Sequence, residues 1–375
     1  MMIHPKTFFD ALTNNGISFY TGVPDSLLKD FCAYITDHTT SENHVIAANE
    51  GGAVALATGY HLATEKIPLV YFQNSGLGNA TNPLLSLASE GVYSIPMVLL
   101  IGWRGEPGTN DEPQHQVQGA VQNALLDAME IPYFILDNRV NNVSGFLKPV
   151  IELASQHNKP VAIVVKKGVF QPYKSAYSND PFEMTREEAI HEVLKYISPS
   201  SLVVSTTGKL SRELYEHRYF NHQSSKGDFL TVGSMGHASQ IAMGIALNTD
   251  KTVYCLDGDG AAIMHMGAFA ITGNSKAQNY IHVLFNNGSH ESVGGQPTVG
   301  FKINFQQIAE ACGYKQTFKV SNKKDIKMIF SVIEKNKGPV FVEIMISKGS
   351  KSGLMRPKNS PRENKIGFIH KLREL

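Results

Sequence analysis

The regular alternation of short apolar runs with longer, helix-like segments constrains the fold of this chain more than any other feature. The runs are continuously apolar rather than alternately apolar and polar, which indicates strands of a parallel sheet covered by helices on both faces. Each half is therefore predicted to be one doubly wound α/β domain of about six strands. The runs span residues 17–23, 44–49, 69–74, 97–103, 133–137 and 161–166, and then 201–208, 228–233, 252–257, 280–287, 317–320 and 340–346.

A polar stretch at residues 171–187, QPYKSAYSNDPFEMTRE, separates the two halves and is interpreted as a linker. At its end, TREE predicts a capping box that opens the next helix. We therefore expect one domain over residues 1–170 and a second over 188–375, and a chain of 375 residues is long enough for both. The last segment, 348–375, is rich in Lys and Arg, and such basic tails are usually solvated.

Charge and cysteine content exclude several classes of partner. A formal net charge of +1 gives no bulk attraction to nucleic acid or to an anionic membrane, so any recognition of an anion has to be local. The longest apolar run, around residues 95–103, is too short to cross a bilayer, and the first residues lack the apolar core of a secretory signal. Cys32, Cys255 and Cys312 are scattered and odd in number, which predicts a reducing compartment, the cytoplasm.

Two oxygen-bearing side chains follow consecutive strands of the second half. Asp259 stands between Gly258 and Gly260, and Asn287 comes one β-α-β crossover later. Such oxygens suit Mg²⁺, which takes its other ligands from phosphates and water. The glycines let a ligand approach the backbone, and a helix expected to open at Ala261 would offer free N–H groups to a phosphate. The pair predicts a magnesium-bridged diphosphate, whereas either tripeptide alone would be a common turn.

The arrangement of GDG and NN resembles the signature of the enzymes that depend on thiamine diphosphate. The resemblance implies that the first half is a pyrimidine-binding domain and the second a diphosphate-binding domain. It also implies that Asp259, Asn287 and the backbone carbonyl of Ser289 bind Mg²⁺. The chain leaves no room for the middle domain of the larger decarboxylases in this family.

Three further segments resemble cofactor-binding parts of the family. IAANEGGAVALATGY (46–60) places Glu50 opposite N1′ of the aminopyrimidine, where burial would raise the pKa of its carboxyl so that it can share a proton. GSMG (233–236) implies that Met235 bends the cofactor and that the carbonyl of Gly233 lies near the 4′-amino group. The segment TTGK implies a diphosphate loop of Thr207, Gly208 and Lys209.

Glu50 and Met235 also have purely structural interpretations. Glu50 could be a helix-start carboxylate that interacts with the helix dipole, and Met235 could be a methionine of the apolar core. For both residues it is the surrounding motif that favours the functional interpretation.

Within the family, GVPDSLLK, NSGLGNATNPLLSLA and NNGSHESVGGQPT most resemble the phosphonopyruvate decarboxylases, a branch that also lacks the middle domain. The resemblance implies decarboxylation of 3-phosphonopyruvate to phosphonoacetaldehyde and CO₂ in phosphonate biosynthesis. Sulfopyruvate decarboxylase, or another 2-oxo-acid decarboxylase, is the alternative within the family, because the phosphonate and sulfonate substrates differ mainly in the charge of the second anionic group.

Three residues are candidates for the proton transfer that such a reaction needs. They are Asp25 in GVPDS, His115 in DEPQHQVQG and His290, which lies three residues past Asn287. The polar, Gly- and Pro-bounded surroundings of His115 predict a mobile active-site loop. The structural alternatives are a helix N-cap for Asp25 and solvated loop positions for the two histidines.

The second anionic group of the substrate needs cationic donors. Arg104 and Arg356 are predicted to bind it, because arginine matches the geometry of a phosphonate. Arg212 is a further cation, whereas Lys209 is expected to serve the cofactor. The basic tail that carries Arg356 could close over the site.

The resemblance also predicts at least a homodimer, because the family builds each site from the first domain of one subunit and the second domain of another. Two other classes of protein remain. A nicotinamide-dependent oxidoreductase is disfavoured because Thr81 stands where the third glycine of its fingerprint would be. A non-catalytic cofactor-binding subunit is disfavoured because Glu50, Asp259 and Asn287 are all present.

Overall fold

The computed structural model describes residues 1–175, 180–333 and 337–374. The chain divides into two compact units, one of residues 1–178 with 293–296 and the other of residues 179–292 with 297–375. The predicted linker, 171–187, lies partly outside the described residues. Its TREE motif forms the predicted capping box, since Thr185 and Glu188 cap each other at the start of helix α7.

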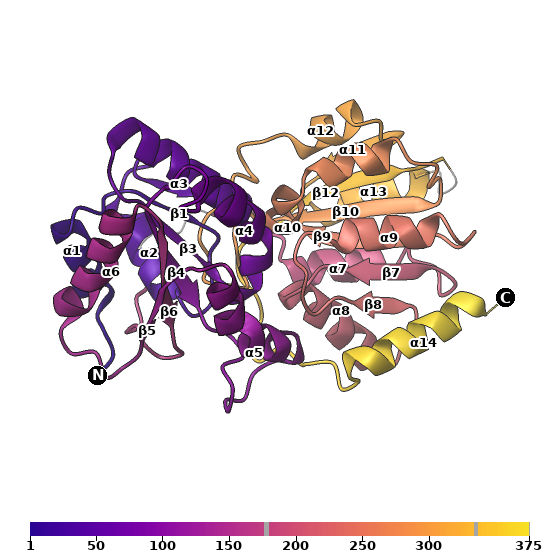
Figure 1. Ribbon diagram of the computed structural model, residues 1–375. Coiled ribbons are helices and arrows are strands. Elements are labelled where there is room, and N and C mark those ends of the chain that lie inside the picture. The colour runs from indigo at the N-terminus through magenta and orange to yellow at the C-terminus, as the bar shows by residue number, and fades with distance from the viewer. Residues whose placement is uncertain (176–179, 334–336, 375) are drawn as a thin grey trace. The chain divides into compact units, whose positions relative to one another are not determined.

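The first unit contains one parallel sheet of six strands in the order β2-β1-β3-β4-β6-β5 (Figure 1). Its strands are β1 (Tyr20–Gly22), β2 (His44–Ile46), β3 (Leu69–Gln73), β4 (Met97–Gly102), β5 (Tyr133–Leu136) and β6 (Pro160–Val165). Its helices are α1 (Pro5–Asn14), α2 (Lys29–His38), α3 (Glu50–Thr64), η1 (Asn74–Gly76), α4 (Leu77–Pro83), η2 (Leu84–Ala88), α5 (Pro113–Ala128) and α6 (Val143–His157).

The second unit contains another parallel sheet of six strands, in the order β11-β12-β10-β9-β7-β8. Its strands are β7 (Leu202–Ser205), β8 (Asp228–Leu230), β9 (Val253–Gly258), β10 (Tyr280–Asn286), β11 (Gln316–Val320) and β12 (Val340–Met345). Its helices are α7 (Arg186–Leu194), α8 (Lys209–Phe220), α9 (Ala238–Ala246), α10 (Asp259–Met264), α11 (Gly267–Gly273), α12 (Phe305–Ala311), α13 (Lys323–Val332) and α14 (Pro361–Arg373).

The predicted fold class is confirmed: each apolar run of the sequence contains most or all of one strand. Each sheet has an apolar layer on both faces, as continuous apolar strands require. In β4, for example, Val98 and Leu100 pack into one layer, while Leu99 and Ile101 pack into the other. If strands are counted within each unit, both sheets have the same order, 2-1-3-4-6-5.

Three local expectations are corrected. Helix α10 begins at Asp259 rather than at Ala261, with Gly258 as its N-cap. His115 lies in the first turn of α5 rather than in a loop, and Pro113 at the first helical position is the signal for that helix start. The basic tail is not merely solvated, because its last part forms α14, which opens with a capping box of Ser360 and Glu363.

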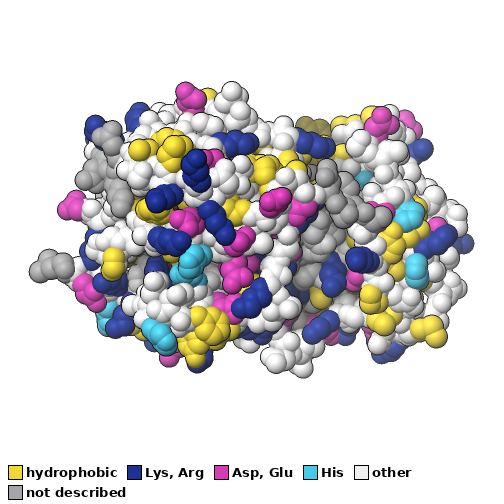
Figure 2. All heavy atoms as spheres, turned by 180° about the vertical axis from the view of Figure 1, so that it is seen from behind, with side chains coloured by type: hydrophobic (Ala, Val, Ile, Leu, Met, Phe, Trp, Pro, Cys, Tyr) yellow, Lys and Arg dark blue, Asp and Glu magenta, His cyan; other side chains and the backbone are white. Residues whose placement is uncertain are grey.

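Helix α14, yellow in Figure 1, packs against β8. Phe368 joins the apolar layer of the second sheet, and the side chain of Asn364 bonds the backbone of both Asp228 and Leu230. No helix among the described residues is long and apolar enough to cross a membrane. On the face shown in Figure 2, acidic and basic side chains are interspersed, as the near-zero net charge suggests.

Candidate functional site

In the first unit, Asp25 follows β1 and is fully buried. Its Oδ1 accepts a hydrogen bond of 2.6 Å from the side-chain amide of Gln73, and its Oδ2 accepts one of 3.0 Å from the N–H of Leu27. Burial raises the pKa of the Asp25 carboxyl, and these two bonds oppose that rise only in part. Asp25 is not a helix N-cap, because α2 begins after Leu28, so the structural alternative for this residue is wrong.

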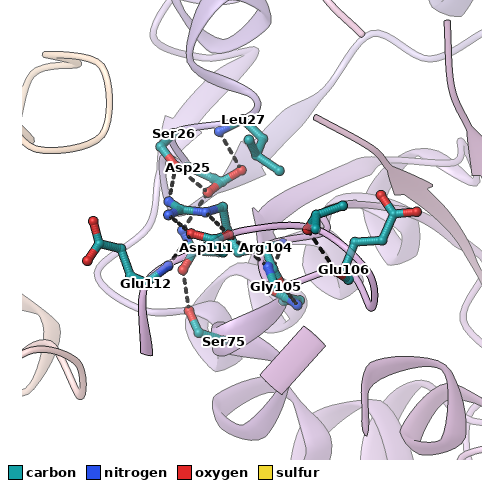
Figure 3. Close-up of polar contacts among 12 residues, drawn as sticks. Asp25, Ser26, Leu27, Ser75, Arg104, Gly105, Glu106, Asp111 and Glu112 are labelled. Atoms are coloured by element: carbon teal, nitrogen blue, oxygen red, sulfur yellow. Dashed lines mark hydrogen bonds and ion pairs between the residues drawn. The ribbon is translucent and has the colours of Figure 1, made fainter. Parts of the chain in front are cut away.

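Arg104, just past β4, is held by Asp111 in a two-pronged ion pair (Figure 3). The Nε and Nη2 atoms of Arg104 lie 2.8 and 2.5 Å from the two carboxylate oxygens, and its Nη1 donates to the hydroxyl of Ser26 at 2.8 Å. The backbone N–H groups of Gly105 and Glu112 also donate to Asp111. The guanidinium holds the pKa of Asp111 far below its usual range. Arg104 is therefore already strongly paired with a carboxylate of its own chain.

His115 lies in the first turn of α5, shortly after Asp111 in the sequence. Its backbone carbonyl packs so closely on Gly105 that a Cβ there would lie 1.9 Å from it. The Nδ1 atom of His115 is buried without a hydrogen-bond partner among the described residues. Burial, assisted by the charge of Arg104, lowers the pKa of His115 to about 4, so the ring is neutral at pH 7.

Glu50, also in the first unit, is the first residue of α3, and its side chain is buried. Its Oε2 accepts a 2.8 Å hydrogen bond from the amide of Asn79, and its Oε1 lies against Gly76, where an added Cβ would be 2.2 Å away. Burial raises the pKa of Glu50, in the direction predicted for a carboxyl that shares a proton. Glu50 does start a helix, so it has both the structural position and the environment suited to the functional role.

In the second unit, Asp259 follows β9 and is buried. One of its oxygens accepts a short hydrogen bond from the hydroxyl of Thr298. Burial raises the pKa of Asp259 to about 6, although Thr298 and the backbone N–H of Asn287 oppose the rise. A carboxylate in such a place gains most from a nearby cation, because a cation compensates the cost of burying its charge.

Asn287 and Ser289 form a turn just past β10, and both are buried. The Oδ1 atom of Asn287 accepts a 3.0 Å bond from the N–H of Ser289, and the hydroxyl of Ser289 has no partner among the described residues. The hydrogen bond from the backbone N–H of Asn287 to the carboxyl of Asp259 brings the two predicted ligands together. Side-chain and backbone oxygens in one buried place are the donor set that Mg²⁺ prefers.

His290 and Met235 both adjoin the turn at Asp259. A Cβ added to Gly260 would lie 3.0 Å from Nδ1 of His290 and 3.4 Å from the methyl group of Met235. His290 is buried, its Nδ1 has no partner among the described residues, and burial lowers its pKa to about 4. Met235 is half-buried in the loop between β8 and α9, outside the apolar layers, so the interpretation as a core methionine is wrong.

The predicted diphosphate loop lies at the start of α8. Gly208 caps that helix with a φ of 97°, a backbone conformation that favours glycine. The Nζ atom of Lys209 lies 3.1 Å from a carboxylate oxygen of Glu291, and the hydroxyl of Thr207 donates to the carbonyl of Val232, next to Gly233. By contrast, a Cβ added at Gly258 would meet nothing within 4 Å, which leaves room for a ligand at that turn.

The basic tail is attached to the second unit through Arg212. Its guanidinium donates to the backbone carbonyls of Leu354 and Met355, so Arg212 holds the segment that precedes Arg356. Arg356 itself is exposed. Arg212 therefore supports the tail, and we do not propose it as a binding residue for the second anionic group of the substrate.

Several residues that shape these sites were missed in the sequence. Gly76 and Asn79 belong to NSGLGNAT, whose resemblance to the family assigns neither residue a role, and both contact Glu50. Gln73 and Asp111 were missed because nothing in the sequence pairs them with Asp25 or Arg104. Thr298 was missed because its role depends on the chain folding back onto Asp259.

Comparisons with known proteins agree with this picture. Residues 5–131 match the model of the N-terminal TPP binding domain of thiamine pyrophosphate enzymes, and residues 206–344 match that of the C-terminal TPP binding domain; thiamine pyrophosphate is thiamine diphosphate. The phosphonopyruvate decarboxylase of Streptomyces hygroscopicus is 32% identical over 96% of this chain and 92% of its own length. That of Streptomyces viridochromogenes is 32% identical over 96% and 93%. The sulfopyruvate decarboxylase of Methanosarcina acetivorans is 26% identical over 94% of each chain.

Proposed function

Because the chain belongs to the thiamine-diphosphate-dependent decarboxylases, in the branch that includes the phosphonopyruvate decarboxylases, we propose that it converts 3-phosphonopyruvate to phosphonoacetaldehyde and CO₂ with Mg²⁺ as a second cofactor. The observation that supports the substrate is identity spread over nearly the whole of both chains. A reaction of this kind would serve phosphonate biosynthesis.

For the cation, we propose Asp259, Asn287 and the carbonyl of Ser289 as protein ligands. The fit rests on the buried carboxylate with its raised pKa and on an adjoining turn rich in oxygen atoms. The open space at Gly258 and the first-turn N–H groups of Gly260 and Ala261 suit a diphosphate that completes the coordination. Thr207, Gly208 and Lys209 would hold the same diphosphate from the neighbouring loop.

For the organic part of the cofactor, we propose Glu50, Met235 and Gly233. When bound, thiamine diphosphate supplies the carbon nucleophile and the electron sink for loss of CO₂. Glu50 would hold a proton at the aminopyrimidine N1′: burial favours this by raising its pKa, while the bond from Asn79 opposes the rise in part and orients the carboxyl. Met235 would press against the cofactor from its half-buried loop, and the carbonyl of Gly233 would accept from the 4′-amino group.

Asp25, His115 and His290 remain the candidates for moving the proton that replaces CO₂. The raised pKa of Asp25 favours a carboxyl that carries a proton, whereas the lowered pKa of each histidine favours a neutral ring that accepts one. Asp25 therefore has the environment of an acid, and the histidines have the environment of bases or neutral hydrogen-bond donors.

For the second anionic group of the substrate, we propose Arg104 and Arg356. Arg104 is already paired with Asp111, so the anionic group of the substrate would have to compete with that carboxylate. A dianionic phosphonate would compete more strongly than a monoanionic sulfonate, and this supports the phosphonate as the substrate. The sulfopyruvate relative keeps the sulfonate as the alternative.

The test is aldehyde and CO₂ formation by the purified chain from phosphonopyruvate, with and without thiamine diphosphate and Mg²⁺. Comparison of kcat/KM for phosphonopyruvate, sulfopyruvate and pyruvate then assigns the substrate. Turnover of phosphonopyruvate that depends on both cofactors is expected. A preference for sulfopyruvate would replace the proposed substrate, and absence of CO₂ release from all three acids would favour a non-catalytic subunit.

We extend the proposal to organisation and location. Residues 1–170 would bind the pyrimidine and residues 188–375 the diphosphate and Mg²⁺, with sites completed at the interface of at least a homodimer. Val117, Val121 and Leu125 form an exposed apolar stripe along α5 that supports self-association. Sedimentation that shows an active monomer would contradict the proposed homodimer.

The free cysteines support a reducing compartment, the cytoplasm.

A further inference from the structure

Glu343 is a carboxylate in an unexpected place. It lies on β12, its residue surface is 0% exposed, and its strand neighbours Val342 and Ile344 are core residues. A charged group is costly in such surroundings unless specific partners compensate it. The partners of Glu343 therefore indicate what the carboxylate is for.

Two groups contact the carboxylate of Glu343. Its Oε1 accepts a 2.8 Å hydrogen bond from the side-chain amide of Asn286, and its Oε2 lies 3.2 Å from Nζ of Lys319. Lys319 is on the edge strand β11, and its side chain is 38% exposed, so that ion pair is only partly shielded from water. The bond to Asn286 is fully buried, since both residues are 0% exposed.

Glu343 and the carbonyl of Gly300 together determine which way the amide of Asn286 points. An ionised carboxylate can only accept, so it selects the NH₂ end of the amide. The same Nδ2 also donates to the carbonyl of Gly300 at 2.8 Å. The carbonyl end, Oδ1, then accepts the N–H of Gly288 at 3.1 Å and closes the turn that follows β10.

This turn presents two of the proposed cation ligands, Asn287 and Ser289. The bond to Gly300 also sets the position of the third. Gly300 packs so closely that an added Cβ would lie 2.6 Å from Oδ1 of Asn286 and 2.7 Å from Oδ2 of Asp259. The N–H of Gly300 donates to the hydroxyl of Thr298, which in turn donates to Asp259. One amide thus connects Glu343 to the whole ligand set.

We propose that Glu343 is a positioning residue for the cation site: by fixing the amide of Asn286, it sets the turn at residues 287–289 and the close packing of Gly300 on Asp259. The inference rests on the proposed function, because it takes these residues as the cation ligands. Outer-shell partners of metal ligands change metal affinity by about 10- to 100-fold when they are replaced.

The experiment measures Mn²⁺ affinity of the full-length protein, without thiamine diphosphate, by electron paramagnetic resonance. Glu343→Gln keeps the shape but replaces the charge-assisted bond to Nδ2 of Asn286 by a weaker neutral one, so the turn is held less firmly. A fall in Mn²⁺ affinity of about 10-fold or more is expected, together with faster hydrogen exchange of the backbone amides at 286–290. Thermal unfolding monitors the fold of each variant.

The matched control is Glu213→Gln in the same unit. Glu213 is 3% exposed and, like Glu343, is a buried carboxylate, but its two-pronged pair is with Arg186 rather than with the turn at residues 286–290. It should change stability but leave Mn²⁺ affinity within about twofold of wild type, well short of the outer-shell effect. A control that weakens Mn²⁺ binding as much as Glu343→Gln would overturn the specific role of Glu343.

The outcomes separate the two proposals. Wild-type protein that binds no Mn²⁺ overturns the proposed cation site and the positioning role together. Wild-type and Glu343→Gln proteins that bind equally well overturn only the role of Glu343. If Glu343→Gln does not fold, Glu343→Asp decides: its carboxylate is withdrawn from Asn286 by one methylene, so unchanged affinity would refute the role.

Discussion

The two sheets have the same strand order but carry different chemistry at their carboxyl ends. In the first unit, acids follow the first and second strands, and each accepts a hydrogen bond from a side-chain amide: Asp25 from Gln73 and Glu50 from Asn79. In the second unit, an acid and an amide follow the third and fourth strands, and Asp259 accepts a side-chain hydrogen bond from the hydroxyl of Thr298. One topology thus supports two kinds of site, depending on which strand ends carry the polar residues.

The two sites show that a buried carboxyl can suit either a proton or a cation. Burial raises the pKa of Glu50 and of Asp259 alike, because it disfavours the charged form of each carboxyl. The amide partner of Glu50 keeps it oriented for a proton, while the oxygen-rich surroundings of Asp259 suit a cation. If this assignment is correct, variants in the two units should fail in different measurements.

The largest expected effect is that of Glu50→Gln on turnover. The substitution keeps the shape but removes the proton-sharing carboxyl, so kcat should fall by about 10²- to 10⁴-fold. Mn²⁺ affinity of the second unit should not change. The control is Glu65→Gln at the exposed end of the same helix, which should retain full activity. A Glu50→Gln enzyme as active as wild type would remove Glu50 from the proposed mechanism.

Asp259→Asn should give the opposite pattern. Loss of a ligand charge should weaken Mn²⁺ binding by more than the roughly 100-fold that outer-shell changes cause. Activity should then depend on much higher Mg²⁺ concentrations, an outcome that steady-state assays over a metal titration can measure. Normal metal affinity in this variant, or weakened affinity in Glu50→Gln, would break the division of roles between the two units.

Much of this division could be predicted from the sequence, because apolar runs locate strands and strand ends locate ligand-binding loops. In this way the sequence predicts Asp259 and Asn287 as cation ligands and, through its motif, Glu50 as the residue at the aminopyrimidine, and these roles stay predictions. Thr298 and Glu343 could not be found, because each acts on a residue that the sequence places far away and only the fold brings near. The helix at His115 differs from the prediction for another reason: Pro113 is compatible both with a loop and with the first position of a helix, and the structure shows the helix.

A smaller effect should follow from Gly76→Ala. The added Cβ would lie 2.2 Å from Oε1 of Glu50, and the carboxylate is the part able to move, so it should be pushed away from Asn79. Strain of about 1–3 kcal/mol corresponds to a loss of roughly 5- to 160-fold in kcat. The fold should persist.

Gly78→Ala provides the matched control, because Gly78 lies in the first turn of α4, the helix that Gly76 caps, and its Cβ would meet nothing within 4 Å. It should leave kcat unchanged. Equal losses in the two variants would mean that the helix, rather than the contact with Glu50, is responsible.

The smallest expected effect concerns stability at acidic pH, for which buried histidines in the two units should behave alike. Burial lowers the pKa of His44 in the first unit and of His217 in the second to about 4. Each folded-state pKa lies below the unfolded value, so the unfolded chain binds more protons as pH falls below 6.5. The stabilisation is therefore present above pH 6.5 and is lost as pH falls toward 4, by at most about 3 kcal/mol for His44 and by less for the half-buried His217. Thermal unfolding at pH 7.5 and pH 5 should show a smaller acid-induced shift in both His44→Gln and His217→Gln than in wild type. If only one of the two variants shows a smaller acid-induced shift, the units differ in their interiors as well as at their strand ends.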